Sequence, residues 1–168
     1  PLWSADVPAD PLSDAFVESA GHCGIPFTHD FNGGDNTGAG YFRMNTRNGV
    51  RMSTDRAYLR PAAQRPTLQV LTGAPALRLS RAGTRVTGVE VMHQSQLKRL
   101  RARHEVVVCA GALQSPQLLQ LSGIGPAELL RQHGIEVALD LPGVGQNLQD
   151  HLQVRPSYRC QDVVTLND

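Results

Sequence analysis

A continuous apolar run that ends in a glycine is the sequence feature that most constrains the fold of this chain. Val106–Val108 stand together without a polar interruption, and Cys109–Gly111 follow directly. A strand buried on both faces of a parallel sheet has this continuous pattern, whereas a strand with one face in water alternates apolar and polar residues. The sequence therefore predicts a buried parallel strand that begins near Glu105.

Two helices are predicted after this strand. Ser115 and Pro116 make a favourable N-cap and first-turn pair, the leucines that follow supply an apolar side, and Gly123 ends the helix. A second helix spans 126–134, with an acidic residue in its first turn and basic residues in its last, as the helix dipole prefers. The next segment, 135–151, is predicted as a short strand, a glycine-rich turn and a polar stretch.

Upstream of this unit the apolar pattern changes to a period of two. Four segments alternate in this way and are predicted as successive strands of a meander: 67–73, 75–83, 84–94 and 96–103. The hairpin turn between the second and third strands centres on Gly83. Polar residues occupy the alternate positions, so one face of the meander is expected in water. The basic run 98–103 is assigned to this solvated face rather than to a nucleic-acid site, because aromatic residues do not accompany it.

The N-terminal third is predicted to hold one clear helix and one hairpin. Residues 10–24 have the pattern of a helix whose N-cap is Asp10 or Ser13. Asn48-Gly49 is a strong turn signal between two short extended runs. A further short helix follows the second run and is expected to end before Pro61.

Composition excludes several classes of function. The 168 residues carry a formal charge of +1 and 5% aromatic residues, which gives no basis for nucleic-acid binding. No apolar run approaches the ~20 residues of a membrane span. Three cysteines without zinc-ligand spacing predict neither a disulfide framework nor a metal site, and they suggest a reducing compartment. Since the first residues do not resemble a signal peptide, a cytoplasmic location is expected.

From the residues alone, the end of the apolar strand has two interpretations. Gly111 has no side chain, so a nucleotide could approach the backbone there, beyond the carboxyl end of a strand. The same glycine could serve only the packing of a strand against a helix. The G-x-G-x-x-G fingerprint of dinucleotide-binding folds is absent, which disfavours an NAD-linked enzyme.

Ten positions within fifteen residues resemble a known family signature. They are Gly111, Ala112, Ser115, Pro116, Leu118, Leu119, Ser122, Gly123, Ile124 and Gly125. In order and spacing they resemble the second signature of the glucose-methanol-choline (GMC) family of flavin oxidoreductases, and the likeness is greatest to its choline-dehydrogenase-like branch. Further segments resemble the family in the same order: 30–33, 49–53, 57–62, 68–74, 87–91 and 141–152.

The resemblance implies an α/β fold class, as part of an FAD-binding Rossmann-like domain with a β-meander, plus parts of the substrate domain. It divides the chain into three parts. Residues 1–62 form a mixed substrate-side or connecting segment, residues 63–150 form a flavin-domain portion, and residues 151–168 form the start of a substrate-domain segment. The flavin-domain portion holds the meander, the strand–helix unit and the second helix, at 66–104, 105–125 and 126–134.

The implied cofactor is FAD, and four residues are implied to contact its adenosine side. In the family a backbone group after the segment "LTG" contacts the adenine, and the matching residue here is Ala76. The end of the apolar strand lies against the adenosine-diphosphate half in the family, and the matching residues are Cys109, Ala110 and Gly111. At this position Cys109 is expected to be a small buried apolar residue rather than a reactive thiol.

The resemblance also implies a reaction, in which the parent protein oxidises a small alcohol to an aldehyde or ketone and hydride passes to flavin N5. The family's phosphate-binding loop and its catalytic histidine lie before and after these residues, so an internal fragment, inactive alone and without a catalytic residue, is expected. His151 beside Asp150 is predicted to have a structural role, because adjacent residues of an extended segment point apart. A catalytically dead binding or interaction domain derived from the family is the alternative.

Overall fold

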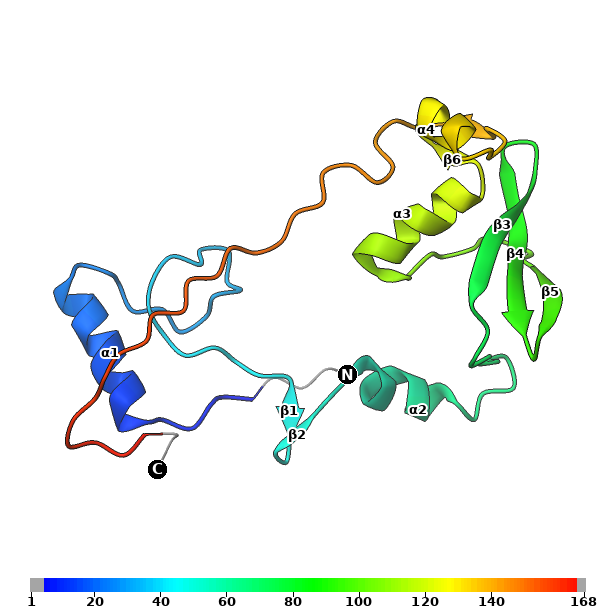
Figure 1. Cartoon of the computed structure of the whole chain (residues 1–168). Coiled ribbons are helices and arrows are strands. Elements are labelled where there is room, and N and C mark those ends of the chain that lie inside the picture. Colours follow the sequence, from blue (N-terminus) through cyan, green and yellow to red (C-terminus); the bar gives the residue numbers. More distant parts are fainter. Residues whose placement is uncertain (1–4, 166–168) are drawn as a thin grey trace. The chain divides into compact units, whose positions relative to one another are not determined.

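The computed structural model describes residues 5–165 and divides the chain into two units (Figure 1). The first comprises Pro1–Gln69 with Arg155–Asp168, and the second comprises Val70–Val154. The first four residues of the predicted 1–62 segment and the last three of the predicted 151–168 segment lie outside the described residues. Helices and strands are mixed, as expected for an α/β fragment. The domain limits inferred from the resemblance stay a prediction.

The first unit begins with helix α1, Pro11–His22, as predicted. Of the two candidate N-caps, Asp10 is the one used, because its Oδ2 accepts hydrogen bonds from the Ser13 backbone N–H at 3.0 Å and from the Ser13 hydroxyl at 2.8 Å. Cys23 is the C-cap, and Gly24 follows with a φ of 81°. A residue in this left-handed conformation commonly ends a helix.

The predicted hairpin is confirmed in the same unit. Strands β1, Thr46–Arg47, and β2, Val50–Arg51, pair antiparallel. Both residues of the turn between them have positive φ, 50° for Asn48 and 70° for Gly49. This conformation is that of the type I′ turn, which Asn-Gly favours.

The short helix after the hairpin is longer than predicted. A π-helical turn, η1 at Asp55–Leu59, continues directly into α2, Arg60–Ala62. The N–H of Arg60 bonds to the Asp55 carbonyl, five residues back. The expected end before Pro61 is therefore wrong, because the helical backbone continues from η1 through Pro61 to Ala62.

The second unit contains the predicted meander, reduced to three strands. These are β3, Ala76–Ala82, β4, Arg85–His93, and β5, Gln96–Arg101, paired antiparallel in the order β3-β4-β5. The β3–β4 turn is at Gly83, with a φ of 59°. The strand predicted at 67–73 is absent, because this stretch forms local turns such as the bond from Leu68 N–H to the Arg65 carbonyl.

The apolar run 106–108 does not form a strand in this structure. Val107 is 71% exposed, and no strand among residues 5–165 pairs with the run. A parallel strand depends on neighbours for its hydrogen bonds, and apolar composition alone does not supply them. The predicted buried parallel strand is therefore wrong for the described residues.

Helix α3 begins earlier than predicted, at Gly111, and ends at Leu121. Ser115 and Pro116 lie inside the helix and do not start it. The Ser115 hydroxyl accepts a hydrogen bond from the N–H of Ala110 at 3.1 Å, so it stabilises the helix start from the second turn. The preference of Ser-Pro for a helix start gave the wrong boundary, because this side chain reaches back past the first turn.

A compact strand–helix–strand unit follows α3. Strand β6, Ile124–Gly125, pairs parallel with β7, Leu139–Asp140, and helix α4, Ala127–Gln132, connects them. The Asp140 carboxylate accepts a hydrogen bond from the N–H of Ala127 at 2.9 Å, so β7 caps α4. The second helix is close to its predicted limits, 126–134, and a short strand follows it within the predicted segment, whereas β6 was not predicted.

Burial is concentrated in the second unit. Its buried apolar residues are Leu79, Val91, Leu118, Ala127 and Leu130, and Leu130 is 1% exposed. In the described part of the first unit, the one residue of this kind is Ala57. No helix within residues 5–165 is long and apolar enough to cross a membrane.

Candidate functional site

The turn at 109–111 leads into helix α3 and is open to solvent. Cys109, Ala110 and Gly111 are all exposed. Gly111 has a φ of 87°, and a Cβ built on it would meet no heavy atom within 4 Å. A side chain would be strained in this conformation, yet the space it would enter is empty. The turn therefore offers both a glycine backbone and room beside it.

The N-terminus of α3 supplies hydrogen-bond donors at this turn. The N-cap, Ala110, has no side chain that could accept from the first turn. The first N–H groups of a helix have no partner within the helix, and they carry the positive end of its dipole. Backbone N–H groups here can therefore receive an anionic group such as a phosphate.

A cavity of about 630 Å³ continues from this turn along α3. It begins at Ala112 and Leu113, and the segment 145–149 lines its other side. The side-chain amide of Gln120 donates to the Val144 carbonyl at 3.2 Å and holds this segment against the helix. Gly145 permits this approach because it has no Cβ. A Cβ there would lie 2.8 Å from the amide nitrogen of Gln120, which is too close.

Segment 145–149 was not assigned to the site from the sequence. Its signal is the "GVGQN" stretch, in which Gly145 and Asn147 have φ values of 83° and 56°. Two positive φ values in three residues fold the segment back on α3. The sequence showed the glycines, but the contact with Gln120 spans 24 residues of chain and could not be deduced from them.

Ala76 lies on a different element from the turn at 109–111. It is the first residue of β3, is exposed, and pairs with Val91. Among the described residues, no hydrogen bond joins Ala76 to Cys109, Ala110 or Gly111. The cofactor contacts of these four residues stay predictions.

Cys109 is exposed and not buried as expected. The expectation depended on a paired strand at 106–108, and without that pairing the sulfur has no apolar cover. Within residues 5–165, no group of three or more His, Cys, Asp or Glu side chains could hold a metal ion.

His151 and Asp150 do not form a catalytic pair in this structure. The Asp150 carboxylate accepts from the backbone N–H of His151 at 2.8 Å, so it is bound to the main chain and not to the imidazole. Both residues are exposed. A general base needs its orienting partner on the ring, which this geometry does not provide.

Comparison with known protein families gives one match over most of the chain. The profile of the family described as GMC oxidoreductase matches residues 4–153. Among curated proteins, the oxygen-dependent choline dehydrogenase of Burkholderia thailandensis is 48% identical over 158 residues, and that of Brucella anthropi is 45% identical over 157 residues. Each alignment covers 94% of this chain and 28% of the relative, so the chain spans just over a quarter of the length of these relatives.

Solved structures of oxidases and oxidoreductases superpose on most of the chain. Pyridoxine 4-oxidase from Mesorbium loti superposes with a TM-score of 0.83 at 35% identity, covering 90% of this chain and 30% of that one. An FAD-dependent oxidoreductase from Chaetomium thermophilum gives 0.78 at 32% identity, with 84% and 25% covered. A fungal aryl-alcohol oxidase gives 0.78 at 29% identity, with 89% and 26% covered.

Proposed function

The chain belongs to the GMC oxidoreductase family, and on that premise we propose that it forms part of the FAD-binding site of an alcohol oxidoreductase. The observation that carries the proposal is the open turn at Gly111, with a free helix N-terminus and an empty space beside a glycine backbone. A structural relative is described as FAD-dependent, which supports the choice of this cofactor.

The residues present fit one half of such a cofactor. The backbone of Cys109–Gly111 would lie against the adenosine-diphosphate portion, and the N–H groups at the start of α3 would donate to its phosphates. Ala76 would contact the adenine through its main chain. When bound, FAD supplies the chemistry of hydride acceptance, while the protein contributes binding and orientation.

The substrate is proposed from the names of the relatives. Choline dehydrogenases and an aryl-alcohol oxidase are among them, and these names share alcohols as substrates. We therefore infer that the whole protein oxidises a small alcohol. Since the Asp150 carboxylate is bound to the main chain and does not orient the His151 imidazole, we propose no catalytic base at His151, and the chain by itself is expected to show no turnover. Weak binding of FAD is expected as well, because the four residues proposed here contact only its adenosine-diphosphate half.

Substitution at Gly111 tests the proposed cofactor contact. Gly111→Ala places a methyl group in the empty space beside the turn, and the expected result is FAD binding weakened at least about tenfold. Gly134→Ala is the matched control, because Gly134 also has positive φ, at 68°, with open space around its Cβ, and it lies after α4. Both substitutions carry a similar backbone strain, so only the position of the methyl group differs.

The measurement is quenching of flavin fluorescence on titration of the chain into FAD, with NAD added as a competing ligand. Equal weakening by the two variants would show that strain, and not the site, governs binding. Tighter binding of NAD than of FAD would contradict the choice of cofactor, and dye-linked alcohol oxidation by the chain alone would contradict the expected inactivity.

A further inference from the structure

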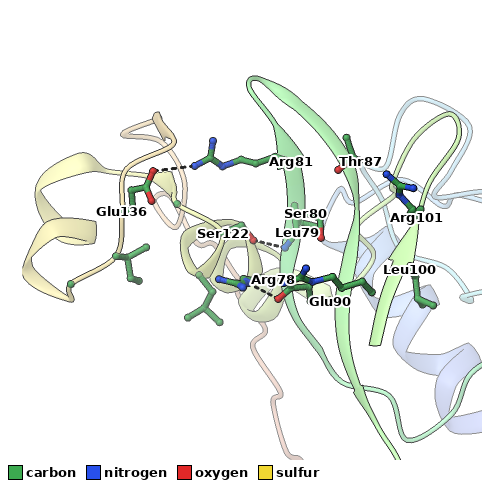
Figure 2. Close-up of a pocket in the computed structure, with 15 residues that line it drawn as sticks. Arg78, Leu79, Ser80, Arg81, Thr87, Glu90, Leu100, Arg101, Ser122 and Glu136 are labelled. Atoms are coloured by element: carbon green, nitrogen blue, oxygen red, sulfur yellow. Dashed lines mark hydrogen bonds and ion pairs between the residues drawn. The ribbon is translucent and has the colours of Figure 1, made fainter. Parts of the chain in front are cut away.

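A second, polar cavity lies on the meander, apart from the turn at 109–111 (Figure 2). Its volume is about 940 Å³, within the range of small-molecule sites. The strands of the meander form its floor, and the end of α3 with residues 134–136 forms a wall. The charged residues that line it are Arg78, Arg81, Arg99, Arg101, Glu90 and Glu136.

Glu90 orients two of these arginines. The register places it between Arg78 on β3 and Arg99 on β5. Its Oε2 accepts from Arg78 Nε at 2.6 Å and its Oε1 accepts from Arg99 Nε at 2.8 Å. The carboxylate is buried, with 7% of its side chain exposed, whereas the two arginine side chains are 57% and 69% exposed.

Both guanidinium groups keep donors for a ligand. An arginine has five N–H donors, and the bonds to Glu90 use only the one on Nε. The Nη groups of Arg78 and Arg99 form no other hydrogen bond among the described residues. They are fixed in direction by a buried carboxylate, so little side-chain entropy would be lost on binding an anion.

Arg78, Glu90 and Arg99 form one row across the three strands, and a second row lies beside it on the same face. Ser80, Gly88 and Arg101 are paired across the three strands, two residues along from the Glu90 row. Gly88, in the middle of this row, is buried against the backbone of β5, and the cavity is lined by Ser80 and Arg101 on either side of it. Residues two apart on a strand are about 6.6–6.8 Å apart, so one tetrahedral anion could reach the guanidinium groups of both rows.

The charge of the cavity selects the anion. Arg81 is paired with Glu136 at 3.6 Å, while Arg101 forms no ion pair within the described part of the chain. Four arginines against two glutamates leave two positive charges. We propose that this cavity binds a small phosphomonoester as its dianion, held by the Nη groups of Arg78 and Arg99 and by Arg101.

Binding of glycerol 3-phosphate and of inorganic phosphate to the chain, measured by calorimetry at constant ionic strength and without FAD, tests the proposal. Arg101→Gln should weaken binding at least about fivefold, because it removes a charge-assisted donor. Arg103→Gln is the control, since this residue follows β5, is exposed and does not line the cavity. It removes the same charge from nearby, and it should change the affinity less than twofold.

The pH dependence provides a second readout. A phosphomonoester becomes a dianion above its second pKa, about 6, so the affinity of the chain should be lower at pH 5.5 than at pH 7.5. Arg101→Lys keeps the positive charge but loses the paired N–H donors of the planar guanidinium group, so this variant should bind the phosphomonoester with intermediate affinity. Circular dichroism checks that each variant remains folded.

Equal weakening by Arg101→Gln and Arg103→Gln would overturn the proposal in favour of diffuse electrostatic attraction. Affinity that does not change between pH 5.5 and pH 7.5 would also overturn it, since the second negative charge would then contribute nothing. Binding of a phosphoserine peptide with no binding of glycerol 3-phosphate would show a protein ligand instead of a small molecule.

Discussion

Ser122 joins helix α3 to strand β3 through a single hydroxyl group. Its Oγ accepts from the backbone N–H of Leu79 at 2.8 Å and donates to the Leu118 carbonyl at 2.6 Å. The residue is 9% exposed, so water cannot readily replace either partner. This hydroxyl satisfies an edge N–H of the meander that would otherwise be buried without an acceptor.

Substitution Ser122→Ala should lower the free energy of unfolding of the second unit by about 1–3 kcal/mol, because the Leu79 N–H loses its acceptor. Chemical denaturation followed by circular dichroism measures the loss. Ser19→Ala is the control, since the Ser19 hydroxyl also donates four residues back, to Ala15, but on an exposed face and with no second element attached. A loss no larger in Ser122→Ala than in Ser19→Ala would show that the link to β3 contributes nothing.

At the scale of the element, the meander holds a buried carboxylate, that of Glu90, between two arginine side chains. The hydrogen bond from Arg78 lowers the pKa of Glu90, and the charges of Arg78 and Arg99 lower it further, against the desolvation that raises it. The same bond raises the pKa of Arg78. The pairing therefore favours the ionised carboxylate in the folded meander.

This pairing predicts a pH dependence of stability. A carboxyl whose folded-state pKa lies below its unfolded value of about 4.3 stabilises the fold fully above that value and loses the contribution as pH falls through the folded pKa. The hydrogen-exchange protection factors of β3–β5, taken relative to the intrinsic exchange rate at each pH, should therefore fall progressively below about pH 4.3. In Glu90→Gln this acid-dependent part should disappear, and protection at pH 7 should be lower than in the parent chain.

A matched variant is Glu105→Gln, because Glu105 is exposed and outside the meander. It should keep the acid-dependent exchange of the parent chain. If Glu90→Gln retains the same acid dependence, the titration belongs to another carboxyl group.

Elements set by short-range signals could be predicted from the sequence. Asp10 caps α1, Asn48-Gly49 makes the hairpin turn, and Gly83 makes the β3–β4 turn, each through contacts within a few residues. The errors occurred where the outcome depends on distant partners. Val106–Val108 has the composition of a buried strand but no strand among residues 5–165 beside it.

The candidate site was also predicted only in part, and the missed part again depends on distant contacts. Gly111 and the residues before it were predicted through the family signature, and the structure places them at an open helix start. The opposing segment 145–149 was missed because its approach depends on the Gln120 amide. The carboxylate between two arginines was also missed, because a period of two predicts which residues share a face but not how deeply each is buried.

At the scale of the whole molecule, few apolar side chains are buried among residues 5–165. The described part of the first unit exposes large apolar side chains, among them Phe16 at 57% and Phe42 at 70%. The second unit has Leu130 and its neighbours as a core. Since the chain spans 28% of its curated relatives, it aligns with only a minority of the residues that build those proteins.

The two units should therefore differ in stability when the chain is studied alone. We expect α1 to exchange its amide hydrogens faster than β3–β5, and the chain to bind the dye ANS at its exposed apolar surface. Leu130→Ala should destabilise the second unit by about 2–5 kcal/mol and leave exchange in α1 unchanged. One sharp calorimetric transition with equal protection in both units would contradict this expectation.

The parallel pair β6–β7 has a consequence for the order in which the chain gains structure. Its partners, Ile124 and Leu139, are joined by a short connection that contains α4, and Asp140 caps that helix. Closing so short a connection has a small entropic cost, so contacts here form among near neighbours in sequence. The pair can therefore open and re-form as one local folding unit, giving β6, α4 and β7 a shared exchange rate distinct from that of the meander.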